Sequence, residues 1–128
     1  MEYKYSDITG QIIKACLAVY NTLGSGFPEV IYQRALEIEM DFLGLDFIRE
    51  AGVKVYYREK LVGDRRVDFL VADKIPVELK AVSRLDNAHL NQGINYLEAY
   101  NFEVGLLINF GGASLEWKRL YNTKFKTQ

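Results

Sequence analysis

The stretch RVDFLVADKIPVELKAV, residues 65–81, predicts a β-hairpin. Two apolar runs rich in Val, Leu, Ile and Phe flank the short segment ADK, which is typical of a turn between paired strands. Three charged residues interrupt these runs: Asp68, Glu78 and Lys80. Because charged side chains are rarely buried unless they are paired or bind a metal, these three either lie on a solvated face or take part in chemistry.

Side-chain alternation predicts that these charges share one face of the hairpin. A turn centred on Asp73 sets Asp68 across from Glu78, and a turn centred one residue later sets it across from Lys80. Either register keeps the three charges on the same face. The opposite face of the first strand, residues 65–72, is then apolar: Val67, Phe69 and Val71.

Two interpretations of this charged face are open from the residues alone. Two acids directly opposite each other repel, which is unfavourable on a structural surface but suits a divalent cation. Mg²⁺ is typically held by one or two carboxylates together with phosphate and water. A nearby lysine can offset charge in a phosphoryl transition state. The alternative is an ordinary solvated hairpin face.

Two helices are predicted before the hairpin. Residues 6–23 have an apolar stripe at helical spacing, with Ser6 as the N-cap, and GSGF at 24–27 breaks the pattern. Pro28 suits the first position of a second helix, which ends near Leu43. The apolar stripe expected to pack in this second helix is Ile31, Ala35, Ile38 and Phe42.

The chain after residue 46 predicts strands and one further helix, because the hydrophobic period changes to two. The continuous apolar run EVGLLINF is typical of a strand at the centre of a sheet. The order ααβββαββ predicts an α/β fold with one mixed sheet. The predicted elements are two strands and a turn over 47–72, a strand at 75–82, a helix within 83–101 capped by Asp86 or Asn87, and strands at 103–110 and 114–121.

The composition is that of a soluble globular protein, with 49% apolar and 26% charged residues. The 128 residues suit a single domain over 1–128, and no apolar run approaches the ~18 residues of a membrane span. The polar N-terminus lacks the layout of a signal peptide. The single cysteine, Cys16, cannot form an internal disulfide, which favours a cytoplasmic location.

The net charge of −1 gives no general attraction to nucleic acid. Basic residues nevertheless gather in two segments, 49–66 and 118–126. These segments are either local basic patches or ordinary solvated faces. Binding of a polyanionic substrate would have to depend on such patches, on a homo-oligomer or on a protein partner.

Two predicted helices carry polar residues that could join the charged hairpin face. Gln92 and Tyr96 are four apart and lie nearly opposite the apolar stripe of the third helix, with His89 close to them. They either face solvent or contact phosphate. Glu29, in the first turn of the second helix, either complements the helix dipole or supplies a third carboxylate.

Taken in order, these residues resemble the PD-(D/E)XK nuclease superfamily. Glu29 opens a helix, Asp68 lies on one strand and Glu78-Leu79-Lys80 on the next. QGINY at 92–96 fits the QxxxY pattern of the RecB-like exonuclease branch, and GFPEVIY at 26–32 matches the GxxExxY signature of a small bacterial family. The resemblance extends from about Ile8 to Tyr121 and implies a mixed β-sheet flanked by helices.

The resemblance implies a metal site at the hairpin. Asp68 and Glu78 would ligate Mg²⁺ or Mn²⁺, helped by the backbone carbonyl of Leu79. Glu29 would complete or adjust the site, directly or through water.

The resemblance also implies groups that act on the substrate. Lys80 would position the nucleophilic water and stabilise charge. Gln92 would orient Lys80 or the substrate phosphate, and Tyr96 would support that face or contact DNA.

The expected function is therefore a divalent-metal-dependent nuclease that hydrolyses phosphodiester bonds, with DNA as the expected substrate. One alternative is a catalytically silent module with the same fold that binds nucleic acid or a protein. Another is a hydrolase of smaller phosphate esters. Metal binding at Asp68 and Glu78 distinguishes the nuclease from the silent module. A comparison of nucleotide with polynucleotide substrates distinguishes it from the hydrolase of smaller phosphate esters.

Overall fold

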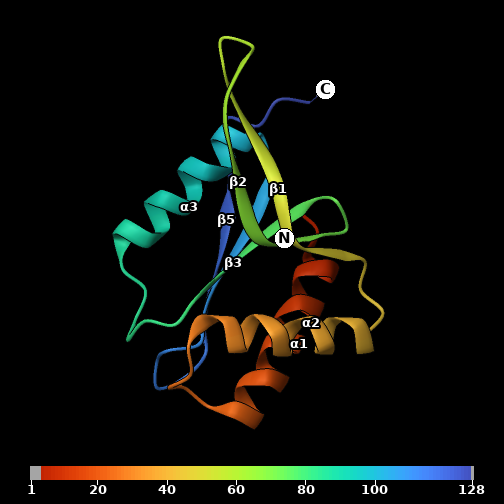
Figure 1. Cartoon of the computed structure of the whole chain (residues 1–128), viewed down its shortest axis with the longest axis vertical. Coiled ribbons are helices and arrows are strands. Elements are labelled where there is room, and N and C mark those ends of the chain that lie inside the picture. The colour runs from red at the N-terminus through yellow and green to blue at the C-terminus, as the bar shows by residue number, and fades with distance from the viewer. Residues whose placement is uncertain (1–3, 128) are drawn as a thin grey trace.

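The computed structural model describes residues 4–127, whose helices and strands follow the predicted order ααβββαββ (Figure 1). This confirms the predicted α/β class. Within these residues, no helix combines the length and the apolar character needed to cross a membrane. The elements are α1 (Ser6–Leu23), α2 (Glu29–Phe42), β1 (Phe47–Tyr57), β2 (Lys60–Val71), β3 (Ile75–Lys80), α3 (Asn87–Tyr100), β4 (Val104–Asn109) and β5 (Glu116–Tyr121).

The strands form one mixed sheet, as predicted, and their order in it is β1-β2-β3-β4-β5. Neighbouring strands are antiparallel except β3 and β4, which are parallel because the chain crosses over through α3 between them. β4 is buried along its whole length, as its apolar run predicts. It lies inside the sheet, next to the middle strand β3.

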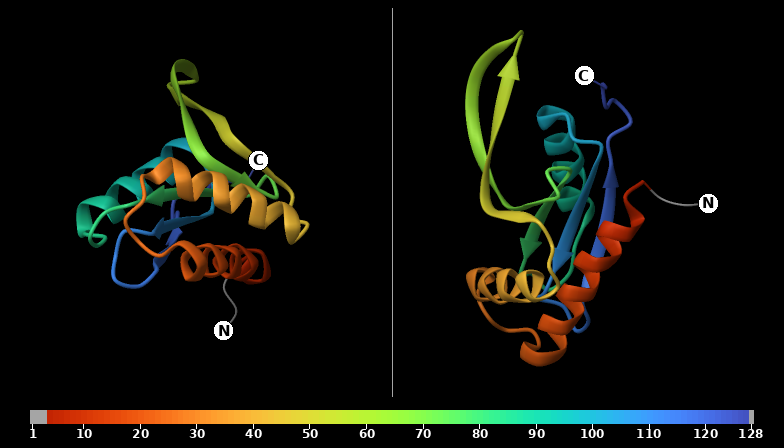
Figure 2. Two further views of the ribbon diagram at one scale, coloured as in Figure 1. Left: turned by 60° about the horizontal axis from the view of Figure 1, so that its bottom comes forward. Right: turned by 90° about the vertical axis from the view of Figure 1, so that its right-hand side faces the viewer.

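Helices cover both faces of this sheet (Figure 2). α1 and α2 pack on the larger apolar cluster, in which Leu36 of α2 meets Val77 and Ile108 of the strands. α3 packs on the other face, where Leu97 meets Leu107. Successive residues of β4 thus point to opposite faces, which is the alternation expected of a strand.

The buried face of α2 is not the predicted one. Ile38 and Phe42 are 70% and 82% exposed, while Leu36 and Met40 are fully buried. The helix carries two apolar series at helical spacing, 31, 35, 38, 42 and 32, 36, 40, and periodicity alone does not tell which of them meets the sheet. The series that packs is Tyr32, Leu36 and Met40, and the Tyr32 hydroxyl also donates a hydrogen bond to the preceding loop.

α2 also begins one residue later than predicted. Pro28 has an extended backbone, with φ −63° and ψ 154°, and is the residue before the helix rather than its first residue. Glu29 is therefore the first helical residue.

β1 and β2 extend beyond the rest of the sheet as a two-stranded arm, which we define as residues 54–64 (Figures 1 and 2). The buried residues Val53 and Val67 mark its base, and every residue from 56 to 64 is exposed. The turn at its tip has positive φ at Arg58 and Glu59, 48° and 67°, as in the tight turns that match the twist of paired strands.

Candidate functional site

The β2–β3 hairpin brings Asp68 level with Glu78. The strand pairs centre the turn on Asp73, which is the first of the two registers considered from the sequence. The backbone pairs between β2 and β3 run from the turn back to Phe69 and Val77 and do not include Asp68. At this position the Asp68 side chain links the two strands instead. Its Oδ2 accepts a hydrogen bond from the backbone N–H of Leu79 at 2.7 Å, which fixes the carboxylate beside β3.

The alternation of side chains between the two faces of β2 is interrupted at Asp68. Residues two apart on either side of it therefore point to opposite faces. Val67 packs in a cluster beside the end of α3, whereas Phe69 belongs to the cluster under α1 and α2. The prediction that Val67 and Phe69 share a face is therefore wrong. The cause lies in β1 at the position level with Asp68, where Glu50 has a φ of 52° and interrupts the regular pleat.

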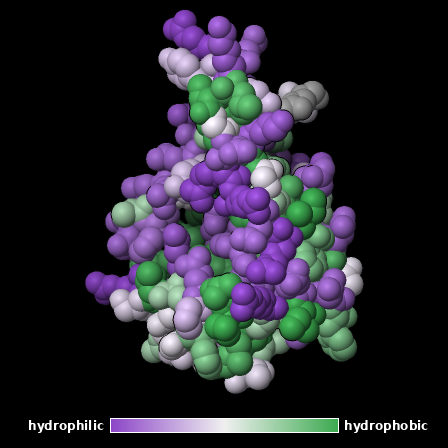
Figure 3. Space-filling view, viewed as in Figure 1, coloured by the Kyte–Doolittle hydropathy of each residue, from purple (hydrophilic) through white to green (hydrophobic). Residues whose placement is uncertain are grey.

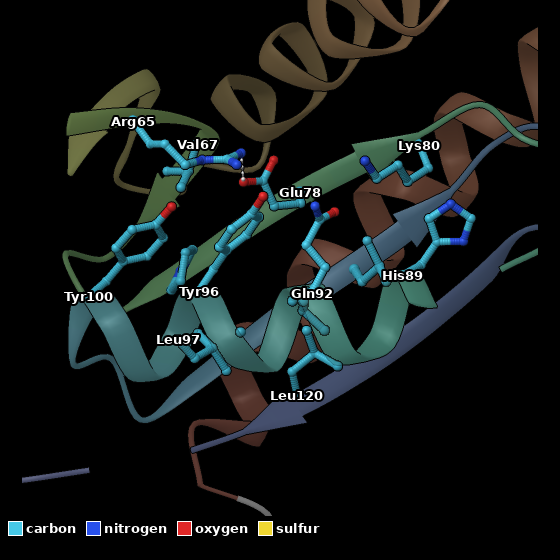
Figure 4. Close-up of a pocket in the computed structure, with 15 residues that line it drawn as sticks. Arg65, Val67, Glu78, Lys80, His89, Gln92, Tyr96, Leu97, Tyr100 and Leu120 are labelled. Carbon is cyan, nitrogen blue, oxygen red and sulfur yellow. Dashed lines mark hydrogen bonds and ion pairs between the residues drawn. The ribbon is translucent and has the colours of Figure 1, made fainter. Parts of the chain in front are cut away.

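Glu78 and Lys80 point from β3 toward α3 and line a cavity of about 210 Å³ (Figure 4). α3 contributes Gln92 and Tyr96 to the same cavity, and Figure 4 shows Gln92 reaching toward β3 between Glu78 and Lys80. Among the residues that the structure describes, the Lys80 ammonium has no hydrogen-bond or ion-pair partner. The cavity therefore holds an available cation beside an acid.

The carboxyl group of Glu78 is poorly solvated and lies next to a second acid. Its side chain is 23% exposed, and its Oε1 lies 3.3 Å from Nη2 of Arg65. Burial, the negative charge of Asp68 and a hydrogen bond with Asp68 together raise the pKa of Glu78 to about 8, against the opposing charges of Arg65 and Lys80. In the absence of a further cation, ionisation of Glu78 is therefore costly in the folded chain.

Arg65 joins the arm, the acids and α3. Its guanidinium lies 4.0 Å from the centroid of the Tyr96 ring, which is close enough for a cation–π contact. Tyr96 in turn stacks with Tyr100 of the same helix, with ring centroids 5.8 Å apart. Arg65 is thereby fixed between Glu78 and an aromatic wall of the cavity.

α2 reaches Asp68 through Gln33, which is 6% exposed. The Nε2 of Gln33 donates to Asp68 Oδ1 at 2.8 Å, and its Oε1 accepts from Nε of Arg49 at 2.9 Å. Arg49 is also ion-paired with Glu37 at 3.5 Å. These bonds determine which way the Gln33 amide points and hold the Asp68 carboxylate from α2.

Glu29 lies on the more exposed side of Asp68. Partial loss of solvent raises the pKa of Glu29, and the charge of Asp68 adds to this, while Lys80 opposes it. Glu29, Gln33 and Asp68 border the same shallow hollow. The third acid therefore faces Asp68, and it is separate from the cavity that Glu78 lines.

The loop before α2 is anchored by Gly26 and Tyr32, which flank Glu29 in the sequence. Gly26 has a φ of 108°, a conformation that favours glycine. The hydroxyl of Tyr32 donates to the carbonyl of Gly24 at 2.6 Å and accepts from the N–H of Phe27 at 3.2 Å. These bonds fix the start of the helix that presents Glu29.

His89 lines the cavity but is engaged as a capping residue. Its N–H donates to Asp86 Oδ1 at 3.0 Å, and its Nδ1 accepts from the N–H of Asp86 at 3.1 Å. Asp86 is thus the N-cap of α3, one of the two caps predicted from the sequence.

Gln33 and Arg65 contact the acids without having been predicted to do so. Gln33 has a sequence signal, because it lies four residues after Glu29 and projects from the same side of α2. Arg65 has none, since it is one of several basic residues in 49–66. Only the packing of α3 beside β2 brings Tyr96 over its side chain.

The donor set suits one divalent cation bound by two carboxylates. In residues 4–127 no group of three or more His, Cys, Asp or Glu side chains is arranged to hold a metal. Mg²⁺ does not need such a group, because it usually keeps several waters and binds one or two carboxylates plus substrate phosphate. The Asp68 carboxylate accepts hydrogen bonds from Gln33 and Leu79 besides its hydrogen bond with Glu78, and its two oxygens retain lone-pair capacity for a cation. A cation would also relieve the repulsion between Asp68 and Glu78.

Comparisons with known proteins agree with this architecture. A family model described as the PD-(D/E)XK nuclease superfamily matches residues 6–120. A crystal structure of SSO0001 superposes with a TM-score of 0.57 and 16% sequence identity over 92% of this chain. The chain spans 60% of the length of SSO0001, and this likeness shows the fold alone. No match is found among curated proteins.

Proposed function

Because the chain belongs to the PD-(D/E)XK nuclease superfamily, we propose that it is a divalent-metal-dependent nuclease that hydrolyses phosphodiester bonds in DNA. The observation that carries the proposal is the pairing of Asp68 with the poorly solvated Glu78, which shares its cavity with the available ammonium of Lys80. Nucleases of this superfamily generally use divalent metals. The proposed cofactor is Mg²⁺ or Mn²⁺, and the proposed catalytic unit is a single domain over 1–128.

The proposed metal ligands are Asp68, Glu78 and the backbone carbonyl of Leu79. Glu29, on the solvent side of Asp68, would complete the site directly or through water. Gln33 would keep the Asp68 carboxylate in place through its 2.8 Å hydrogen bond. A divalent ion supplies electrostatic polarisation of the scissile phosphate and activation of water.

The remaining cavity residues would act on the substrate and on the attacking water. Lys80 would donate to the water and offset the charge that develops on the phosphoryl oxygens. Gln92, between Glu78 and Lys80, would donate its amide N–H to a phosphate oxygen or orient Lys80. Tyr96 would support this side of the cavity through its contact with Arg65 and face the DNA strand.

A finer assignment within the superfamily is also proposed, to the GxxExxY family of the RecB-like branch. It rests on Gly26, Glu29 and Tyr32 in one loop and helix start, and on Gln92 and Tyr96 in α3. The anchoring bonds of Tyr32 and the placement of Gln92 in the cavity support it.

A cleavage assay tests the proposed function. Labelled single-stranded and duplex DNA are incubated with Mn²⁺ or Mg²⁺ and with the wild type, Glu78→Gln or Asp68→Asn. We expect metal-dependent cutting by the wild type and a loss of at least 100-fold in both variants, because each removes a charged ligand. Glu39→Gln, the same substitution on α2 away from the cavity, is the matched control and should cut normally.

The same assay separates the alternatives. No cutting by the wild type, together with no Mn²⁺ binding in calorimetry, would reject the nuclease and leave the catalytically silent binding module. Hydrolysis of small phosphate esters without cutting of polynucleotides would favour the smaller-substrate hydrolase. Cutting that survives in both Glu78→Gln and Asp68→Asn would place the active site elsewhere.

A further inference from the structure

The arm of residues 54–64 exposes apolar and aromatic side chains that nothing in the described chain covers. Tyr56 and Tyr57 are 56% and 66% exposed, and Leu61 and Val62 are 56% and 63% exposed. Figure 3 shows hydrophilic side chains at the tip of the arm and an apolar patch directly beneath them. An exposed two-stranded hairpin is marginally stable by itself, so an arm of this composition suggests a binding element.

The arm and the two residues that follow it carry a positive charge in a chain whose net charge is −1. The arm itself contains three basic and two acidic side chains, a net charge of +1, and Arg65 and Arg66 at its base raise this to +3. Arg65 is paired with Glu78, and no ion pair is found within residues 4–127 for the other basic residues. Those residues are all exposed: Lys54, Arg58, Lys60 and Arg66.

The cations occupy both faces of the arm. In the backbone register of the two strands, Lys54 lies opposite Asp64 and Lys60 lies opposite Tyr57. Because successive residues of a strand alternate, Lys54 and Lys60 lie on opposite faces, while Arg58 is in the turn at the tip. The arm can therefore contact negative charges on both of its sides. A partner with two parallel rows of phosphates, one on each side of a groove, would match this arrangement.

We infer that the arm binds duplex DNA by lying in its major groove, with the basic residues on the phosphates at either side. The major groove of B-DNA is about 12 Å wide and admits a two-stranded β-ribbon. The major groove of duplex RNA is deep and narrow, so the same arm does not fit there. Single strands are usually bound by several aromatic rings in one groove, whereas Tyr56 and Tyr57 alternate between opposite faces.

The position of the arm relates this contact to the proposed site. Arg65 lies at the base of the arm and lines the cavity next to Glu78. The eight residue-to-residue steps from Lys60 to Asp68 extend at most about 26 Å at a strand rise of ~3.3 Å per residue. At ~3.4 Å per base pair, the arm would reach about eight base pairs to one side of the cleaved bond.

This inference rests on the proposed function for its substrate but is tested by binding alone. Affinity for a labelled 20-bp DNA duplex is measured by fluorescence anisotropy, in the Glu78→Gln background to prevent cutting. The arm variant carries Lys54→Gln, Arg58→Gln and Lys60→Gln. The matched control carries Lys14→Gln, Lys74→Gln and Lys118→Gln, which also removes three exposed basic residues.

We expect the arm variant to bind the duplex at least tenfold more weakly at 0.1 M salt. The slope of log affinity against log salt should fall by about 2 to 3, because each phosphate contact contributes about 0.9. The control should change affinity less than twofold, and thermal unfolding should be unchanged in both variants. Single-stranded DNA and duplex RNA should bind more weakly than duplex DNA to the parent.

Three results would overturn the inference: equal losses in the arm and control variants, unchanged duplex binding by the arm variant, or stronger binding of single strands than of duplex. A change of oligomeric state in the arm variant, without loss of DNA binding, would identify the arm as a contact between copies of the chain. Arm-dependent duplex binding without any cleavage would leave the inference intact and reject only the nuclease.

Discussion

At the scale of single residues, the charges in the β2–β3 hairpin have distinct structural surroundings. Asp68 is fixed by the N–H of Leu79 and the amide of Gln33, so its orientation is set before any metal binds. Glu78 instead pairs with Arg65 and has a raised pKa. Asp68 is therefore preorganised, and Glu78 is costly to ionise. A bound cation would stabilise the ionised form of this pair.

The raised pKa of Glu78 predicts how stability depends on pH in the metal-free protein. The pKa is about 8 in the folded chain against a model value of 4.5, so the folded state holds this proton more tightly. No cost arises below about pH 4.5, where both states are protonated. The free energy of unfolding should fall as pH rises from there to about 8, since only the unfolded state ionises freely.

Glu78→Gln should remove this dependence, because glutamine does not titrate. Urea unfolding in EDTA should show the variant more stable than the wild type at pH 8, by on the order of 4 kcal/mol, and nearly equal to it at pH 4.5. A difference between the two proteins that is the same at both pH values would contradict the assigned environment of Glu78.

Gln33 is a positioning residue whose removal should weaken metal binding. Gln33→Met keeps the volume of the side chain but removes the hydrogen bonds to Asp68 and Arg49. We expect Mn²⁺ affinity to fall by about 10-fold, the usual effect of losing a partner of a metal ligand. Calorimetry checks this, with Gln11→Met on the exposed side of α1 as the control. Unchanged affinity would show that Gln33 serves stability alone.

At the scale of elements, the start of α2 depends on the hydroxyl of Tyr32. Tyr32→Phe keeps the ring, which stacks on Phe110, but loses the bonds to Gly24 and Phe27. We expect a loss of about 1–2 kcal/mol of stability and a fall in metal-dependent cleavage, because Glu29 is no longer held.

The control for this prediction is Tyr20→Phe, which removes a hydroxyl bond to the carbonyl of Gly112 outside that loop. It should lower stability without changing the metal dependence of cleavage. Equal effects of the two variants on cleavage would mean that the loop does not position Glu29.

The link from β3 to α3 depends on a close approach of backbones at Gly111. A Cβ at this position would lie 2.3 Å from the carbonyl oxygen of Val82, which Asn109 also binds. Gly111→Ala should therefore cost more than about 3 kcal/mol in thermal or urea unfolding. Gly10→Ala in α1 meets open space and should instead stabilise the helix by about 0.5–1 kcal/mol. Similar effects at both glycines would contradict this packing.

At the scale of the whole molecule, the order of elements was predictable because each has a clear period. The hairpin register was predictable as one of two possibilities. The buried face of α2 was not, because the exposed series with Ile38 and Phe42 is as apolar as the buried one. The exchange of faces at Asp68 was not either, since Glu50 gives no signal of its positive φ.

In the candidate site, too, some features could be predicted from the sequence and others could not. Residues that lie on one element at fixed spacing, such as Glu78 with Lys80 or Gln92 with Tyr96, could be associated from the sequence. Side-chain contacts between a helix and the sheet could not be assigned from spacing, because they depend on packing. The Arg65 contact with Tyr96 is of this kind.

The most direct measurement of the central claim is anomalous diffraction from a crystal of the wild type soaked in Mn²⁺. We predict one peak within about 2.0–2.6 Å of carboxylate oxygens of both Asp68 and Glu78, with Glu78 released from Arg65. A peak at another group of residues, or none at millimolar Mn²⁺ with Glu78 still paired to Arg65, would contradict the proposed metal site.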